Sequence, residues 1–469
     1  MSNPARTRPI LIGLDIGTAR IKALGVGLAG EELAEVERPT PWRTDGIQAE
    51  MDPRELADLI LQTVIAVPLE VARAGGDSVR VVAIGVAGMG EAGVLADRLG
   101  RPLAPILAWH DPRGDVDIVG REIGEEAFQR AVGMPLNAQP SLAKILWLRR
   151  MVGAAASAVR FLSLPEWGVC CLGGAPVSEL SLASRTGLLD IGELAPLGGA
   201  VALIGQNLLS ELVPAGSAAG VASGDSLPAS IRGAVLTVAG HDHQAAALAV
   251  GAARPGALFN SLGTAEALVR CVDGPIDPAV VGRLAAQGTT VGWGVAPGCS
   301  TVQEGLRTGL VLERLATLLG AHDRSARRVL GEQALIVDLA DIPHDLIVSD
   351  AETRPALARF ADGLPSAAVW AAAVRDLTAA SARRLERIEA EIGPHSHVTA
   401  AGGWTRNAAL LAAKRRQFGD LEISELREAG ATGAALLAGV AAGIVESPET
   451  DAAPVWPGCR VPRANSEVS

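Results

Sequence analysis

The sequence predicts an α/β protein of two related domains, spanning residues 1–245 and 246–460. A turn at Asp15–Thr18 returns in altered form at Ser261–Thr264, and apolar, strand-like runs flank each copy. The length of 469 residues favours two or more domains over a single core, and an apolar content of 49% is enough to fill them. Sequence identity between the halves is low, so the duplication is inferred from pattern.

The first half predicts a strand, a turn and a second strand, followed by a helix and a buried strand. Apolar runs at Arg8–Leu14 and Ile21–Gly27 flank the first turn, as a hairpin requires. A helix is predicted from Pro53, because apolar residues then recur at helical spacing and an aspartate precedes the proline as a suitable cap. Val79–Val86 is a buried strand that leads into the glycine-rich segment Gly85–Gly93.

The second half repeats this order of elements. Ala257–Leu262 and Ala265–Val272 flank the second turn. Trp370–Ile392 is predicted as a long helix, with alternating Arg and Glu on its exposed face. Val398–Ala401 is predicted as a strand that runs into a Gly-Gly turn and a further helix. The boundary between the two halves is expected near Gln244–Gly256.

Composition and charge argue against several classes of function. The net charge of −11 disfavours broad electrostatic binding to nucleic acid or to an anionic membrane. The five cysteines form no C-x-x-C pair, so neither a disulfide framework nor a zinc knuckle is expected. Asp15 interrupts the N-terminal apolar run before a signal-peptide core is complete, which predicts a cytoplasmic protein. The uncharged run Ala429–Val445 is mostly Ala and Gly and predicts a helix packed closely on a sheet rather than a membrane span.

The two Gly-Thr turns predict two phosphate-binding hairpins. Gly17 and Gly263 let the backbone approach an oxyanion closely, and Thr18 and Thr264 each offer an N–H and a hydroxyl donor. If both turns face one cleft, they would hold the tail of one nucleotide from two sides. Lys22 either neutralises phosphate charge or is one more exposed lysine.

Two aspartates are candidates for chemistry. Asp242 follows an apolar strand at the expected domain boundary, where it could act on a ligand in the cleft or simply cap the next helix. Asp15 next to the first turn could hold Mg²⁺ brought by a nucleotide, or stabilise the hairpin as an Asx turn. If the strand continues through Asp242, His241 and His243 point away from it, so a dedicated transition-metal site is not expected.

The sequence resembles the FGGY carbohydrate kinases over nearly its whole length. No single motif is specific, but the ordered set is. The motifs are Asp15-Ile-Gly-Thr18 with Lys22, Glu50-Met-Asp52-Pro53, Gly85–Asp97, Trp109-His-Asp111-Pro-Arg113, Gly240-His-Asp242, Ser261-Leu-Gly-Thr264, Ala401-Gly-Gly403 and Gly430-Ala-Thr-Gly433-Ala-Ala435.

The resemblance implies two ribonuclease H-like domains of the actin, sugar kinase and hsp70 superfamily, closing around ATP and a small sugar or polyol. It implies that Asp242 is the general base for the attacking hydroxyl and that Asp15 belongs to the Mg²⁺ shell. The remaining nucleotide residues that it implies are Gly17, Thr18, Lys22, Gly263 and Thr264 for the phosphates, and Gly402 and Gly403 for the adenosine.

For the sugar, the resemblance points to Glu91, Trp109, Asp111, Arg113 and His243, with Asp242. Carboxylates accept hydrogen bonds from hydroxyls, and an indole face covers the C–H side of a polyol. Trp109 could instead be plain core.

Several positions depart from the family pattern. Met89 and Glu91 stand where xylulose kinases usually have Gln and His, and Gly90 replaces the arginine that precedes this glutamate in glycerol kinases. Trp404 replaces a small residue in the adenosine motif, and His243 stands where Asn or Gln is common. Neither the glycerol nor the xylulose label therefore transfers directly.

The predicted function is an ATP-dependent kinase for a hydroxyl of a small ketose or polyol, of pentulose or tetritol to triitol size. Two alternatives stay open: an ATPase or phosphatase that uses no sugar acceptor, and a catalytically silent sugar-binding or regulatory protein. The joint presence of Asp15, Thr18, Asp242 and Thr264 speaks against the catalytically silent alternative. The sequence names neither the acceptor nor the oligomeric state, for which a homodimer is one option.

Overall fold

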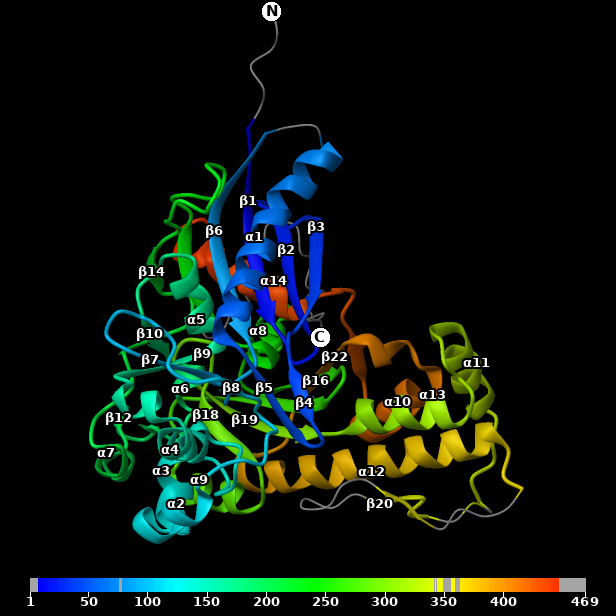
Figure 1. Cartoon of the computed structure of the whole chain (residues 1–469). Helices are drawn as coiled ribbons and strands as arrows, with labels where there is room; N and C mark the ends of the chain where they lie inside the picture. The colour runs from blue at the N-terminus through cyan, green and yellow to red at the C-terminus, as the bar shows by residue number, and fades with distance from the viewer. Residues whose placement is uncertain are drawn as a thin grey trace, which may run out of the picture.

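The computed structural model describes residues 7–75, 78–340, 342, 344–348, 356–358 and 363–446. The predicted end of the second half, residues 447–460, lies outside these ranges. Figure 1 shows two large sheets, each covered by helices. This arrangement confirms the predicted α/β class.

The first sheet contains the first Gly-Thr turn. Its strands, in spatial order, are β14 (Ala218–Val221), β15 (Val235–His241), β6 (Ser78–Gly88), β1 (Thr7–Ile16), β2 (Arg20–Gly27) and β3 (Glu32–Pro39). β1 and β2 form the predicted antiparallel hairpin, whereas β1, β6 and β15 are parallel. Ile16 and His241 are both in register with Gly88, so three strand ends meet at one edge.

The second sheet repeats this topology around the second Gly-Thr turn. Its strands are β18 (Thr290–Trp293), β19 (Cys299–Leu306), β17 (Glu266–Asp273), β16 (Ala257–Leu262), β22 (His397–Ala401) and β23 (Leu421–Ile423). β16 and β17 form an antiparallel hairpin, and β16, β22 and β23 are parallel. The predicted duplication of the hairpin and the following parallel strands is confirmed at the level of topology.

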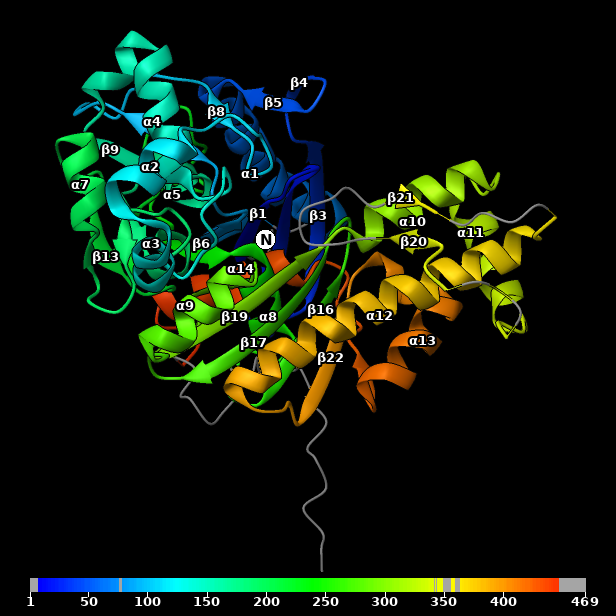
Figure 2. The ribbon, with the colours of Figure 1, turned by 90° about the horizontal axis from the view of Figure 1, so that it is seen from below.

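Helices cover both faces of each sheet. On the first sheet, α1 (Pro53–Gly75) and α5 (Leu164–Cys171) pack on one face, and α8 (Asp242–Ala249) and α14 (Ala429–Ala441) on the other. On the second sheet, α10 (Thr308–Leu318), α12 (Ser366–Ile392), the short 3₁₀ helix η2 (Gly403–Arg406) and α13 (Ala408–Phe418) lie on one face, and α11 (Arg324–Ala334) packs on α12 and α13. The other face packs against α8. Figure 2 shows α12 crossing the strands of this sheet.

Smaller elements fill the long connections. Those before β15 are β4 (Arg43–Asp45), β5 (Gln48–Met51), β7 (Gly93–Ala96), β8 (Ile106–Leu107), α2 (Val116–Ile123), α3 (Glu125–Val132), α4 (Ser141–Met151), η1 (Gly153–Ser157), β9 (Arg160–Ser163), β10 (Val177–Glu179), α6 (Leu180–Ala183), β11 (Leu189–Asp190), β12 (Ala195–Pro196), α7 (Gly198–Ile204) and β13 (Glu211–Val213). Those after it are α9 (Pro278–Ala286), β20 (Ile347–Val348) and β21 (Ala356–Leu357). Many of these elements share a third core, which α9 joins from the second half.

The uncharged C-terminal run forms α14, a buried helix that packs against the first sheet as the sequence predicts (Figure 1). The contact is close because small residues face each other. A Cβ at Gly13 of β1 would lie 1.8 Å from the carbonyl oxygen of Ala431, and one at Gly85 of β6 would lie 2.0 Å from that of Ala434. None of the described helices is both long and apolar enough to cross a bilayer.

We expect Gly13→Ala to destabilise the protein by at least about 2 kcal/mol, because the backbone of α14 must move to admit the new methyl group. Thermal unfolding measures the effect. Gly305→Ala is the matched control: a Cβ at this strand residue meets nothing within 4 Å, so its stability should stay within about 0.5 kcal/mol of the parent. Equal stability of the two variants would contradict the close packing of α14.

Candidate active site

The ends of β1, β6 and β15 bring Asp15 and Asp242 to one edge of the first sheet. Burial raises the pKa of Asp15 to about 8, and the nearby charge of Asp242 adds to this effect. Oδ1 of Asp15 is buried and accepts no hydrogen bond from the described residues. A buried carboxylate with an unpaired oxygen has the properties expected of a group that is completed by a cation.

Asp242 has the opposite electrostatic environment. Burial alone would raise its pKa, but His243, His241, the His243 N–H and Arg185 together lower it. Its side chain is 20% exposed. The two carboxylates therefore lie close together but differ in pKa. The raised pKa of Asp15 favours its protonated form, and the lowered pKa of Asp242 favours the ionised form that can accept a proton from a ligand.

Asp242 is the first residue of α8, and His241 occupies the cap position. This corrects two expectations: Asp242 is not the cap of the helix, and the strand does not continue through it. The condition under which strand alternation would separate His241 and His243 from Asp242 is therefore not met. Nδ1 of His241 lies 3.1 Å from Oδ1 of Asp242, without the alignment of a hydrogen bond, and the two imidazole rings are 5.6 Å apart. Burial lowers the pKa of His241 well below its ordinary value.

The first Gly-Thr turn contacts residues that are distant in sequence. The Trp109 indole N–H donates to the Thr18 hydroxyl at 3.0 Å, and the Trp42 indole N–H donates to the Thr18 carbonyl at 2.8 Å. The Thr18 hydroxyl also lies 4.0 Å from the Met89 sulfur. A predicted phosphate residue is thus hydrogen-bonded directly to a predicted sugar residue, and Trp109 is partly buried and packs against the first core.

Lys22 is not a fully exposed lysine. It pairs with Glu428, and their side chains are 25% and 21% exposed. Gly17 donates its N–H to the Arg20 carbonyl and closes the hairpin turn. The first hairpin is therefore tied to the segment that precedes α14.

Glu91 lies inside the first half and is held by basic and amide groups. Nε of Arg185 donates to Oε1 of Glu91 at 2.8 Å, and Gln139 donates to the same oxygen at 3.0 Å. The backbone of Glu91 has φ of 61°, in the left-handed region that glycine favours. The sequence analysis did not single out Arg185, although one signal existed: it is the only charged residue between Glu179 and Asp190.

Asp111 and Arg113 form a two-point ion pair within the protein. Arg113 donates to both carboxylate oxygens of Asp111, at 2.9 and 2.7 Å, and the backbone N–H of Ala49 donates at 2.8 Å. Arg113 also donates to Glu50 at 2.7 Å and lies over the Trp147 ring. The structure thus shows these two residues organising the loop that carries Trp109, and their direct contact with a substrate stays a prediction.

Asp111→Asn should lower stability by about 2–3 kcal/mol at pH 7 because it removes a buried charge pair. Burial alone would raise the pKa of Asp111, but hydrogen bonds from Arg113 and Ala49 lower it below its ordinary value of 3.8. This stabilisation is therefore present above about pH 4 and is lost as the pH falls through the depressed pKa. Denaturation from pH 7 to 3 should show the difference between parent and variant shrinking, whereas a constant difference would contradict this account.

The second Gly-Thr turn meets the Gly-Gly turn. A Cβ at Gly402 would lie 2.5 Å from the Leu262 carbonyl oxygen, so β16 and β22 bring the two turns together. A Cβ at Gly309 would lie 2.0 Å from the Gly263 carbonyl oxygen, so α10 also packs directly on the second turn. These close approaches require glycine at both positions.

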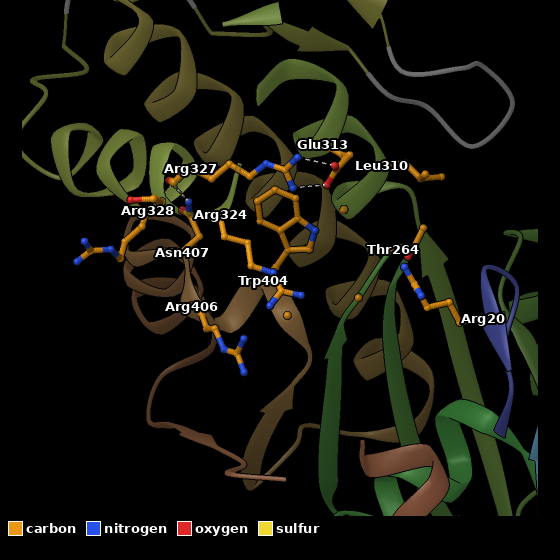
Figure 3. A pocket seen from close by; sticks show the side chains of 14 residues that line it. Arg20, Thr264, Leu310, Glu313, Arg324, Arg327, Arg328, Trp404, Arg406 and Asn407 are labelled. Atoms are coloured by element: carbon orange, nitrogen blue, oxygen red, sulfur yellow. Dashed lines mark hydrogen bonds and ion pairs between the residues drawn. The ribbon is translucent and has the colours of Figure 1, made fainter. Parts of the chain in front are cut away.

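A cavity of about 780 Å³ opens over these turns (Figure 3). Its lining from the second half is Gly263, Thr264, Gly309, Leu310, Glu313, Arg324, Ser325, Arg327, Arg328, Gly403, Trp404, Arg406 and Asn407. Arg20, beside the first Gly-Thr turn, also lines it, and Figure 3 shows this side chain facing Thr264. The two hairpins therefore border one cavity. Arg20 was not predictable as a lining residue, because nothing local distinguishes it from an exposed strand arginine.

Trp404 extends this cavity lining and packs against Trp370, with ring centroids 6.1 Å apart. Beneath the second turn, Glu266 and Lys414 form a completely buried ion pair. Glu266 also accepts hydrogen bonds from Thr308 at 2.6 Å, Ser381 at 2.9 Å and Asn260 at 3.0 Å. This network joins the second hairpin to α10, α12 and α13.

Two sheets of repeated topology, with two hairpin turns at a shared cavity, are the arrangement of the actin- and hsp70-like fold. Residues 10–249 match the sequence model for the N-terminal domain of the FGGY family of carbohydrate kinases. The chain belongs to this family, as the motifs predict, and is a phosphotransferase that acts on a sugar or polyol.

The relatives are named as kinases of different acceptors, xylulose and glycerol. The chain is 28% identical over 451 residues to a xylulose kinase of Streptomyces coelicolor, covering 91% of this chain and 87% of the relative. It is 33% identical over 202 residues to a glycerol kinase of Methylorubrum extorquens, covering 39% and 38%. Glycerol kinase of Plasmodium falciparum with ADP superposes with a TM-score of 0.80 at 18% identity, covering 93% of this chain and 90% of that one.

A xylulose kinase of Rhodospirillum rubrum superposes with a TM-score of 0.76 at 24% identity, covering 92% and 91%. At such identities the superpositions show the fold alone. They confirm the fold predicted from the resemblance and leave the choice of acceptor open.

Proposed function

We propose that the protein transfers the terminal phosphate of ATP to a hydroxyl of a small ketose or polyol, of pentulose size or smaller. The observation that carries the proposal is the position of Asp242, partly exposed and beside Asp15 at an edge of the first sheet, where its histidine neighbours and Arg185 lower its pKa. The neighbouring Thr18 is bonded to Trp109, so phosphate and acceptor residues adjoin.

In the proposed reaction, the acceptor hydroxyl gives its proton to a carboxylate oxygen of Asp242. Its oxygen then bonds to the terminal phosphorus as the bond to ADP breaks, and the product is a phosphate ester. Thr18 and Lys22 from one hairpin and Gly263 and Thr264 from the other orient the phosphates. Positioning of this kind supplies most of the acceleration in phosphoryl transfer.

The residues present fit a magnesium ion that enters with the nucleotide. Asp15 offers a buried oxygen without a partner, and Mg²⁺ keeps most of its waters and needs only one or two carboxylates. When bound, the ion would neutralise phosphate charge that otherwise repels this carboxylate. Gly403, which lines the cavity over the second sheet, and the adjacent Gly402 are proposed to face the adenosine.

An ADP-release assay over trioses, tetritols, pentuloses and hexuloses tests the proposal. We expect acceptor-dependent ADP formation with at least one neutral compound of five carbons or fewer. ATP hydrolysis at an equal rate without any acceptor would support the ATPase alternative and contradict the kinase proposal. Saturable sugar binding without ADP formation across the set would support the catalytically silent alternative.

A further inference from the structure

The pair formed by Glu91 and Arg185 is buried beside the proposed base. The side chains of Glu91 and Arg185 are 4% and 6% exposed. Arg185 contacts Oε1 of Glu91 through two of its nitrogens, and Gln139 donates to that same oxygen. In the described residues Oε2 accepts no hydrogen bond, and it is not among the fully buried atoms without a partner. One carboxylate oxygen is therefore fixed by the protein, and the other stays available as an acceptor.

The path of Arg185 explains the glycine at position 90. A Cβ there would lie 2.8 Å from both Cδ and Nε of Arg185, and 3.1 Å from Cδ2 of His241. Gly90 does not have the positive φ that would itself demand glycine. A side chain at position 90 and the side chain of Arg185 therefore compete for the same space.

Hydrogen bonds at the start of α6 link the segment that carries Arg185 to the end of β15, next to Asp242. Arg185 follows α6, whose Ser181 hydroxyl accepts the His241 N–H at 3.0 Å. Glu179 caps α6 and accepts from the Ser181 hydroxyl at 2.6 Å. The guanidinium thus lies between Glu91 and the end of β15, and its charge helps to keep Asp242 ionised.

Two further cations near the predicted acceptor residues, Arg113 and Lys144, are also occupied. Arg113 is committed to Asp111 and Glu50. Lys144 is 3% exposed, and its ammonium donates to the carbonyls of Trp109, Ala138 and Gln139. Neither is free to neutralise a carboxylate on a ligand.

We propose that the Glu91–Arg185 pair determines acceptor specificity. Because each charge of the pair is neutralised by the other, Arg185 does not attract a carboxylate, and the site takes uncharged polyols and ketoses and rejects sugar acids. Oε2 of Glu91 accepts a hydrogen bond from an acceptor hydroxyl and repels a carboxylate in the same place. Arg185 is a positioning residue in this account. The inference rests on the proposed function and adds the charge class of the acceptor.

The test compares kcat/KM for neutral polyols and ketoses with kcat/KM for aldonates of equal carbon number. The parent should favour the neutral compounds. Glu91→Gln should lower this preference by about tenfold or more, because it removes the repulsion and frees Arg185 to pair with a carboxylate. A purely structural role would lower both values by the same factor and leave the ratio unchanged, which contradicts the inference.

A second set of variants guards against misfolding of Glu91→Gln, which leaves a buried guanidinium unpaired. The double variant Glu91→Gln, Arg185→Met removes both charges and should fold. It should discriminate neither for nor against aldonates, so that the ratio of the two kcat/KM values approaches one. Gly90→Ala should displace Arg185 and weaken use of the neutral acceptor about tenfold, with little change in the KM for ATP. Gly153→Ala is its matched control, because a Cβ there meets nothing within 4 Å.

Binding measurements separate the two proposals. If the parent phosphorylates nothing, the proposed function fails, and calorimetric binding of the same neutral and acidic compounds to parent and Glu91→Gln then tests the pair. If the parent prefers aldonates, or binds neither class, the specificity inference is overturned. Preference for aldonates would leave the kinase activity itself intact.

Discussion

Replacing Asp242 by asparagine is expected to lower kcat by about 10²–10⁴-fold, because the amide has the shape of the carboxylate but cannot take the hydroxyl proton. The KM for ATP should change little, since the nucleotide cavity is lined by residues of the other sheet and by Arg20. Coupled ADP release at saturating acceptor measures the first quantity, and calorimetric titration with ATP measures nucleotide affinity.

Asp45→Asn provides the matched control for this experiment. Asp45 is an exposed residue of the short strand β4, so the same chemical change there should leave turnover unaltered. Turnover of Asp242→Asn within threefold of the parent would show that another group accepts the proton. The lowered pKa of Asp242 also predicts the pH dependence of turnover. Protonation of Asp242 should reduce kcat of the parent only in acid, at pH values below the ordinary pKa of 3.8.

Replacing Lys414 by methionine should have the largest effect on stability, about 3–5 kcal/mol. Lys414 and Glu266 are both 0% exposed, so loss of the ammonium leaves a buried carboxylate without its cation. Burial raises the pKa of Glu266, and Lys414 normally outweighs that effect. Thermal unfolding at pH 7 measures the loss.

Function should fall together with stability in this variant. Glu266 holds Thr308 at the start of α10, which packs on Gly263, so a disturbed network displaces the second hairpin and raises the KM for ATP. Adding Glu266→Gln to Lys414→Met removes the uncompensated charge and should recover part of the lost stability. If the double variant were less stable than Lys414→Met, the ion pair would not be the source of the effect.

Local patterns explain why much of the fold could be predicted. The hairpins around Gly17 and Gly263 depend on apolar runs and turn residues that lie next to each other in sequence. The helix from Pro53 and the strand before Gly402 likewise carry their own start and stop signals. Such signals do not show which sheet a helix covers, and α14 could be predicted as buried without its partner being known.

The site was only partly predictable because its contacts join distant segments. Arg185 reaches Glu91, and Lys22 reaches Glu428, across separations that no local period encodes. The separation of His241 from Asp242 depended on a strand that continues through His243, and it does not hold because β15 ends at His241, two residues earlier. Where a strand ends depends on its neighbours in the sheet, which the sequence alone does not place.

The place of α14 also governs the order in which the protein can be assembled during synthesis. This helix is translated after the whole second sheet, yet it covers one face of the first. Until residues 429–441 have left the ribosome, Leu11, Ala83 and Ala87 lack their partners from α14, and α8 alone does not complete this core. The N-terminal half therefore cannot complete its core by itself, and its proposed base and magnesium residues reach their final positions only when the last described helix docks.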